Sequence, residues 1–102
     1  MNEFQFEAPL WKWQGDGPAS WHFVTLPFDL TDDIDELTTG RQGGFGSVRV
    51  EVTIGCTTWT TSVFPSKEQQ SFILPVKAAV RKAEGLADGV IAHVTLRLID
   101  SP

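Results

Sequence analysis

Residues 47–64 read SVRVEVTIGCTTWTTSVF, and this stretch decides the fold. Apolar and polar residues alternate from Val48 to Ile54, which is the period of a β-strand with one buried face. The same period returns from Trp59 to Val63 after a short break. The stretch therefore predicts two adjacent strands that bury a common face.

The break between the two strands has the residues of a tight turn. Gly55 and Cys56 stand there, and glycine at the first central position suits a type II′ turn because it adopts positive φ without steric cost. A two-residue turn sets Val52 opposite Trp59, so the apolar residues of both strands share one face. A shift of one residue would separate them, and we therefore expect this hairpin to organise the fold.

Composition indicates one soluble domain that spans residues 1–102. Hydrophobic residues make up 41% of the chain and charged residues 21%, and no apolar run approaches the ~20 residues of a membrane span. The sequence shows no signal peptide, and the single Cys56 is compatible with a reducing compartment, so we expect a cytoplasmic protein. The net charge of −5 and the pI near 4.8 argue against broad contact with nucleic acid or an anionic membrane.

Strand and helix patterns precede the hairpin. Alternation predicts strands at residues 3–10 and 21–26. Residues 29–39 have apolar side chains at helical spacing, and Asp29 or Thr31 is suited to cap the start of that helix.

A similar series of elements follows the hairpin. We expect a short strand at residues 71–74, a helix that Gly85 ends, and a last strand at residues 90–99. The spacing predicts an apolar face on this second helix, made of Val76, Ala79, Val80 and Ala83.

The two halves of the chain repeat one another. FVTLP at residues 23–27 and FILP at residues 72–75 are each followed by a short helix, a glycine and a strand. Repetition of such a unit indicates a barrel with pseudo-twofold symmetry in which each helix covers an open seam. The predicted fold is therefore mainly β, a small six-stranded double-split barrel with two short helices.

Three blocks carry a family resemblance: SWHFVTLP at residues 20–27, FGSVRVEVTIGCTTWTTSVFP at residues 45–65 and FILPVKAAVRKAEGLADG at residues 72–89. Together they resemble the bacterial DUF1905 family of domains of unknown function. The resemblance implies a small double-split β-barrel and no established activity.

A second resemblance lies in LPVKAAVRKAEGLADGVIAHV, which starts at Leu74. This segment is similar to the swapped-hairpin repeat of AbrB-type transition regulators, which bind DNA as intertwined dimers. A shared fold does not carry that function across.

Four tryptophans are many for a chain of 102 residues. Trp11 and Trp13 have the opposite parity to the apolar residues before them, so either a bulge re-aims them or they lie on the outer face. Both approach Trp21 across the turn expected at residues 15–18. Barrel packing explains tryptophans in general, but these three are also candidates to line a ligand site.

Lys77, Arg81 and Lys82 form the one basic cluster of the sequence, and helical spacing places them on the solvent side of the second helix. Solvated helix surface is the plain interpretation. The functional interpretation is a patch for an anion or an acidic partner, and it is where a DNA contact of the AbrB type would fall.

Other chemistry finds little support in the sequence. The acidic run at residues 29–36 suits the start of a helix, and it has no ligand spacing known for calcium or zinc, so we expect no metal and no cofactor. His22, His93 and Cys56 lack partners of a catalytic motif, and we assign no catalytic residue.

Three functions therefore remain open. The sequence favours a binding module for a small molecule or a protein partner, as a monomer or homodimer. The alternative is nucleic-acid binding through Lys77, Arg81 and Lys82, which the acidic pI disfavours. An enzyme with an unrecognised site is the third.

Overall fold

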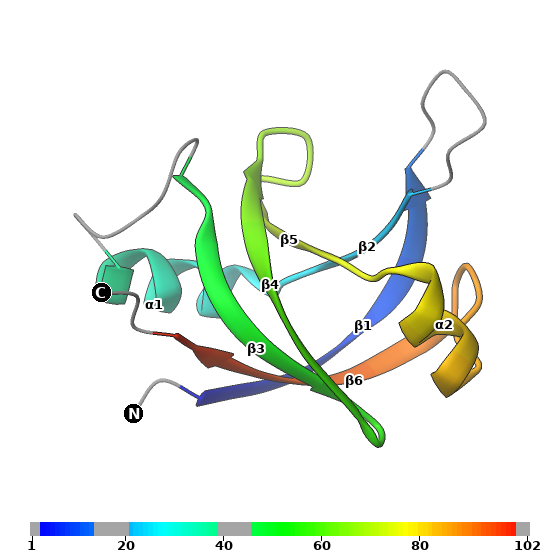
Figure 1. The fold of residues 1–102 in the computed structure, drawn as a ribbon. Helices are drawn as coiled ribbons and strands as arrows, with labels where there is room; N and C mark the ends of the chain where they lie inside the picture. The colour runs from blue at the N-terminus through cyan, green and yellow to red at the C-terminus, as the bar shows by residue number, and fades with distance from the viewer. Residues whose placement is uncertain (1–2, 14–20, 39–45, 100–102) are drawn as a thin grey trace.

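The strands of the protein close into an antiparallel barrel. The computed structural model describes residues 3–13, 21–38 and 46–99, and in this part of the chain the strand order is β1-β2-β5-β4-β3-β6 (Figure 1). The elements are β1 (Glu3–Trp13), β2 (Trp21–Thr25), α1 (Phe28–Thr38), β3 (Val48–Ile54), β4 (Thr57–Ser66), β5 (Ser71–Pro75), α2 (Ala78–Glu84) and β6 (Ile91–Leu98). The predicted mainly-β barrel with two short helices is confirmed.

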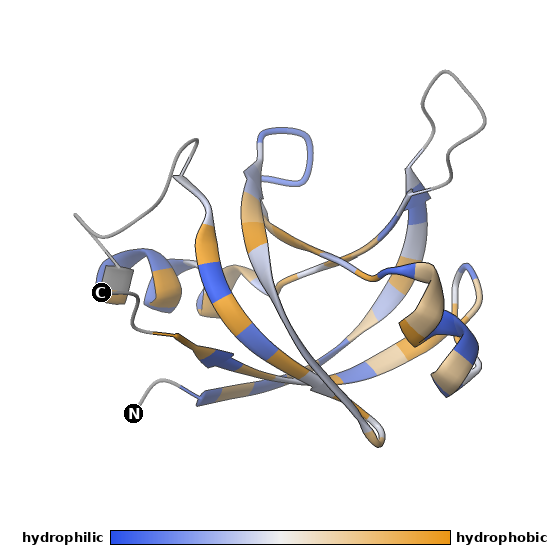
Figure 2. Cartoon of the chain, in the orientation of Figure 1, coloured by the Kyte–Doolittle hydropathy of each residue, from blue (hydrophilic) through white to orange (hydrophobic). Residues whose placement is uncertain are grey.

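The central hairpin has the predicted register. Val52 pairs with Trp59 and Val48 pairs with Val63, so the apolar side chains of β3 and β4 face the interior. Gly55 has φ of 60°, whereas Cys56 does not have positive φ, as a type II′ turn requires. Figure 2 shows the alternation of hydrophobic and hydrophilic residues along β3.

The two longest strands each change neighbour along their length. β1 pairs with β6 from Glu3 to Pro9 and with β2 from Leu10 to Trp13. β4 pairs with β3 from residue 57 to 63 and with β5 from residue 64 to 66. Each strand therefore bridges two parts of the barrel and leaves an edge without a strand neighbour, which we call a seam.

Helices α1 and α2 lie on opposite sides of the barrel (Figure 1). Each contributes a buried side chain to the core, Ile34 from α1 and Val80 from α2. The rest of the core comes from the inner faces of all six strands and the residues that adjoin them: Phe6, Ala8, Leu10, Val24, Leu26, Val48, Val50, Val52, Ile54, Val63, Phe72, Leu74, Val76, Ala92, Val94, Leu96 and Leu98.

The start of α1 differs from the prediction. The helix begins at Phe28, and the amide of Thr31 donates to the carbonyl of Pro27 at 3.0 Å, so neither Asp29 nor Thr31 is the cap. The Thr31 side chain instead contacts β5, where it accepts a hydrogen bond from the amide of Phe72 at 3.2 Å. A tertiary contact has thus replaced the local cap that the sequence favoured.

Helix α2 ends at Gly85 as predicted, with the glycine in the left-handed conformation at φ of 65°. Its apolar face is narrower than expected, because Val76 and Val80 are buried while Ala79 and Ala83 are exposed. The helix is held on the barrel by the buried side chain of Val80 and by a hydrogen bond from Thr57 Oγ1 of β4 to Glu84 Oε2 at 2.7 Å, and Val76 is buried just before it.

The pairing of the strands has pseudo-twofold symmetry. The strand neighbours in the barrel stay the same when β1, β2 and β3 are exchanged with β4, β5 and β6. The amide of Leu26 donates to the carbonyl of Phe72, and the amide of Val76 donates to that of His22, each at 2.9 Å. The two donors, Leu26 and Val76, are 50 positions apart in the sequence, and so are the two acceptors, His22 and Phe72. The predicted repeat is therefore a repeat of three-dimensional structure, but its register is different from the predicted one. The structure makes Val76 the counterpart of Leu26, whereas the alignment of FVTLP with FILP pairs Leu26 with Leu74.

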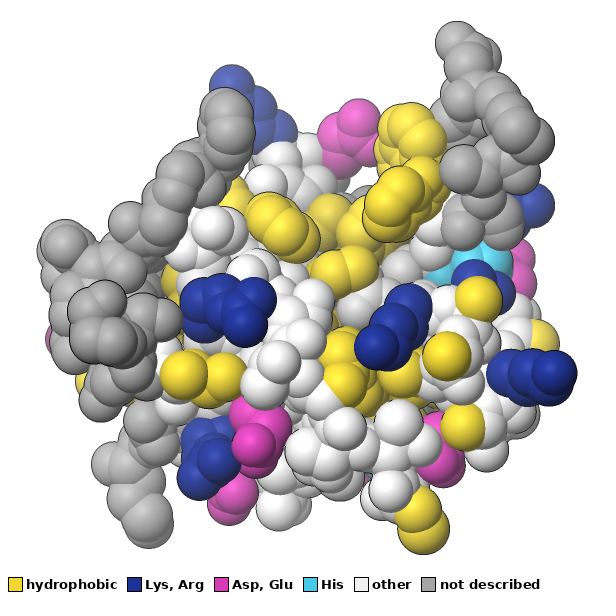
Figure 3. All heavy atoms as spheres, viewed as in Figure 1, with side chains coloured by type: hydrophobic (Ala, Val, Ile, Leu, Met, Phe, Trp, Pro, Cys, Tyr) yellow, Lys and Arg dark blue, Asp and Glu magenta, His cyan; other side chains and the backbone are white. Residues whose placement is uncertain are grey.

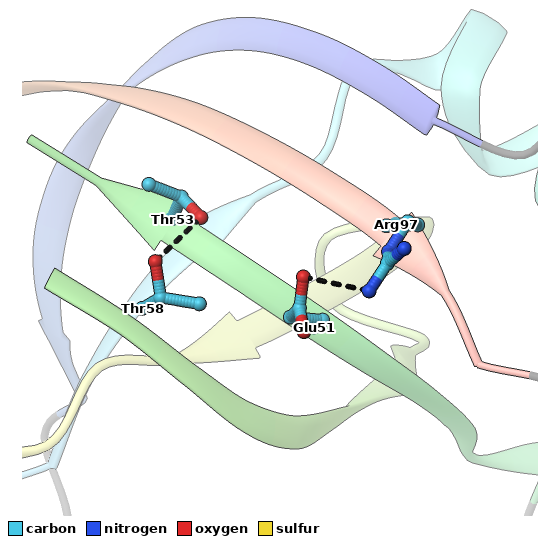
Figure 4. Close-up of polar contacts among 4 residues, drawn as sticks. All are labelled: Glu51, Thr53, Thr58 and Arg97. Carbon is cyan, nitrogen blue, oxygen red and sulfur yellow. Dashed lines mark hydrogen bonds and ion pairs between the residues drawn. The ribbon is translucent and has the colours of Figure 1, made fainter.

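The outer face of β6, β3 and β4 is polar. Arg97 Nη2 donates to Glu51 Oε1 at 3.0 Å, and the hydroxyls of Thr53 and Thr58 lie 2.9 Å apart across the hairpin (Figure 4). These cross-strand pairs are ordinary surface contacts. No helix in the described part of the chain has the length and apolar character that a membrane crossing requires.

Candidate functional site

The outer face along β2 and the Trp13 end of β1 is aromatic, in contrast to the polar face described above. Trp13 pairs with Trp21 across β1 and β2, and their side chains are 43% and 53% exposed. Trp11 pairs with Phe23, and the two ring centres are 5.2 Å apart. The alternation of β1 continues without a bulge, with Leu10 buried, so the tryptophans lie on the outer face.

These aromatic side chains surround a hollow of about 420 Å³. We call it the tryptophan hollow, and its lining residues are Trp11, Trp13, Trp21, Phe23, Ser66, Lys67, Glu68 and Ile73. The Trp11 indole is held in place by a hydrogen bond from Nε1 to Thr25 Oγ1 at 2.8 Å, and this hydroxyl donates to Gln69 at 3.1 Å. The polar atom of Trp11 is therefore satisfied, and the indole offers an apolar surface.

A second hollow, of about 460 Å³, lies at the seam that α2 covers. We call it the α2 hollow, and its lining residues are Trp21, His22, Trp59, Thr60, Thr61, Pro75, Val76, Lys77, Ala78 and Arg81. β4 pairs only with β3 at these threonines, so this edge has no strand neighbour in the described barrel. Figure 3 shows Lys and Arg side chains among hydrophobic ones on the face between β4 and α2.

Two cations project at the α2 hollow. Lys77 is exposed just before the helix, and Arg81 is half-buried one turn later, with Nε donating to the carbonyl of Val76 at 3.2 Å. Among the described residues no carboxylate forms an ion pair with either side chain. The terminal nitrogens of Arg81 can therefore contact an anionic group, to which a guanidinium donates two parallel hydrogen bonds.

His22 also lines this hollow, and it has a buried polar atom without a partner in the described part of the chain. Its Nδ1 is buried and has no hydrogen-bond partner among the described residues. Desolvation and the positive charge of Arg81 lower the pKa of His22, with a smaller contribution from Lys12, while Asp88 acts in the opposite direction. A buried polar atom without a partner is rare in native proteins and commonly marks a place where water or a ligand binds.

The structure divides the six residues that the sequence singled out. Trp11 and Trp13 line the tryptophan hollow, Lys77 and Arg81 line the α2 hollow, and Trp21 lines both. Lys82 lies on the exposed side of α2 and lines neither. Arg81 is not on the solvent side as expected, because its side chain folds back onto the carbonyl of Val76.

Sequence reasoning missed two residues of the α2 hollow. The alternation of β4 predicts Trp59 on the core face, and Trp59 does contact the core, but it also lines the hollow. The sequence shows no catalytic partner for His22 and does not place it at this hollow. Its parity with the buried Val24 was a usable signal, because alternation turns His22 toward the barrel interior while Trp21 and Phe23 point outward.

The seam under α1 occupies the pseudo-equivalent position and is built differently. The offset of 50 positions gives the counterparts at the α1 seam. Ser71 corresponds to Trp21, and Phe72 corresponds to His22. Thr31 corresponds to Arg81. Thr31 Oγ1 is hydrogen-bonded to Ser71 Oγ, which donates to the carbonyl of Leu26 at 2.6 Å. These polar groups therefore satisfy each other.

A hollow of about 450 Å³ adjoins the α1 seam, but its charges differ. Asp32 and Asp35 line it together with Lys67, so this hollow is not a cationic site. The histidine counterpart Phe72 is 4% exposed and belongs to the core. Of the two seams, the one under α2 therefore has the cations and the unpaired nitrogen.

Comparison with known proteins gives a family but no activity. No curated protein matches the chain significantly. A family model described as a domain of unknown function, DUF1905, matches residues 6–96. Because the match covers nearly the whole chain, the protein belongs to the DUF1905 family.

Proposed function

We propose that the domain is a binding module for a small organic anion and that the α2 hollow is its site. The observation that carries the proposal is the position of Lys77 and Arg81, two cations without an ion-pair partner among the described residues, at one hollow that His22 also lines. Trp21 and Trp59 provide apolar walls beside the cations. Such a combination of apolar lining and a few convergent polar groups is typical of small-molecule sites.

Electrostatics supports an anion in this position. The chain carries a net charge of −5, and cations without an acidic partner at one hollow attract a ligand of opposite charge locally. Arg81 is already oriented by its hydrogen bond to Val76, which reduces the entropy lost when a ligand binds.

A titration with ethyl phosphate tests the proposal. Addition of this monoester to ¹⁵N-labelled protein should shift the amide signals of Lys77, Ala78 and Arg81 and the ring signals of His22. Arg81→Gln removes the fork of donors and should weaken binding by about tenfold or more, since hydrogen bonds to charged groups contribute roughly 1.5–3 kcal/mol. Absence of any shift at millimolar ethyl phosphate would overturn the proposal.

Lys82→Gln is the matched control, because it makes the same change of charge on the same helix outside the hollow. We expect its affinity to equal that of the unmodified protein. Equal weakening by Arg81→Gln and Lys82→Gln would instead favour the alternative, a helix surface that contacts nucleic-acid phosphates. A gel shift at low salt then tests that alternative directly.

A further inference from the structure

The α2 hollow and the tryptophan hollow share one wall. Trp21 lines both, and its side chain is 53% exposed between them. The hollows have volumes of about 460 Å³ and 420 Å³, so each has room for part of a small molecule. A ligand that occupies one can extend over the Trp21 indole into the other.

The chemistry of the two hollows is unequal. Lys77 and Arg81 stand at the α2 hollow without an acidic partner in the described part of the chain. The tryptophan hollow has a wall of apolar side chains, with Lys67 and Glu68 of opposite charge at one edge. One end of the joined surface therefore attracts negative charge, and the other end favours an uncharged apolar group.

We infer that the ligand is an amphipathic anion, with its charged group at Arg81 and its apolar chain across Trp21 onto Trp13 and Ile73. The inference rests on the proposed function and adds the chemical class of the ligand. Trp13 is 43% exposed in the free protein, and an apolar chain laid against it removes that surface from water. The ligand binds as a single dissolved molecule and not as part of a membrane, because the two hollows together have room for one small molecule.

A series of n-alkyl phosphates tests the inference, from ethyl to octyl phosphate, each below its micelle concentration. Isothermal titration should show affinity that rises with chain length by up to about fourfold per methylene, which corresponds to ~0.8 kcal/mol for each one fully buried. Trp13→Ala should flatten this dependence and leave the affinity for ethyl phosphate unchanged. Phe28→Ala is the matched control, because Phe28 is 62% exposed and lines neither hollow.

The outcomes separate this inference from the proposed function. Binding of ethyl phosphate with no gain along the series overturns the amphipathic ligand and leaves the anion site intact. No binding by any member overturns both. Equal flattening by Trp13→Ala and Phe28→Ala contradicts the assigned path of the ligand's apolar chain. Sedimentation with phosphatidylglycerol vesicles without binding of the monomers assigns the surface to a membrane and likewise overturns the inference.

Discussion

The seams under α1 and α2 occupy equivalent positions in one barrel, yet their polar groups are paired differently. Under α1, Thr31 and Ser71 bond to each other and to the carbonyl of Leu26. Under α2, Arg81 bonds to the carbonyl of Val76, the counterpart of Leu26, and Thr57 of β4 donates to Glu84 at 2.7 Å. The Nδ1 of His22 has no partner among the described residues. The comparison teaches that symmetry of the fold provides two similar places, whereas the side chains at each place determine which polar groups are paired.

The comparison predicts its largest effect at Phe72 and its counterpart His22. Phe72→Ala removes a side chain that is 4% exposed and should lower the free energy of unfolding by about 3–5 kcal/mol. His22→Ala should lower it by less than about 1 kcal/mol, because the ring is half-buried and its unpaired nitrogen leaves with it. Denaturant unfolding, followed by tryptophan fluorescence, measures both.

A milder substitution keeps this test usable if Phe72→Ala does not fold. Phe72→Leu should lower the free energy of unfolding by roughly 1–1.5 kcal/mol, since the apolar character is retained. Losses of the same size at positions 22 and 72 would show that both seams are structural, which would break the comparison.

A smaller effect is expected at Ser71. Ser71→Ala leaves the carbonyl of Leu26 without the hydroxyl donor at 2.6 Å and should lower the free energy of unfolding by about 1–2 kcal/mol. Ser62→Ala, on the outer face of β4, is the control and should change it by less than about 0.5 kcal/mol. Thermal unfolding monitored by circular dichroism measures the difference, and equal melting temperatures of the two variants would argue against a hydrogen-bonded α1 seam.

The smallest effect is a pH dependence of stability that comes from His22. Desolvation and the nearby Arg81 lower the pKa of His22 in the folded protein, with Asp88 opposing them and Lys12 adding to them. Between this pKa and the unfolded value of 6.5, the unfolded chain binds more protons, so the free energy of unfolding falls as the pH drops through 6.5. Above pH 6.5 the contribution of His22 to the free energy of unfolding is fully present.

Chemical denaturation at about pH 7.5 and about pH 5 measures this contribution when the unmodified protein is compared with His22→Gln. The stability lost on acidification should be smaller in the variant, because glutamine does not titrate. His93→Gln is the control, since His93 is an exposed histidine beside Glu7 on the polar outer face. A variant at position 22 that loses as much stability as the unmodified protein would contradict an unprotonated His22 in the folded state.

Predictions from the sequence succeeded where a local period carries the information. The alternation of β3 and β4 and the glycine of their turn determined the register, because a slip by one residue would expose a whole apolar face. Gly85 ended α2 for a similarly local reason. The predicted cap of α1 was wrong, because the Thr31 hydroxyl forms hydrogen bonds with Ser71 and with the amide of Phe72. These residues lie some forty positions away in the chain.

The sequence by itself determined the barrel, the presence of an internal repeat, and the aromatic and basic residues that are candidates for a site. Only the tertiary structure decided which of these residues meet. Trp21, Trp59 and Arg81 belong to β2, β4 and α2, and their convergence depends on where β4 leaves β5 and α2 covers the edge. That point is set by pairing between distant strands, and a local pattern of residues does not contain it.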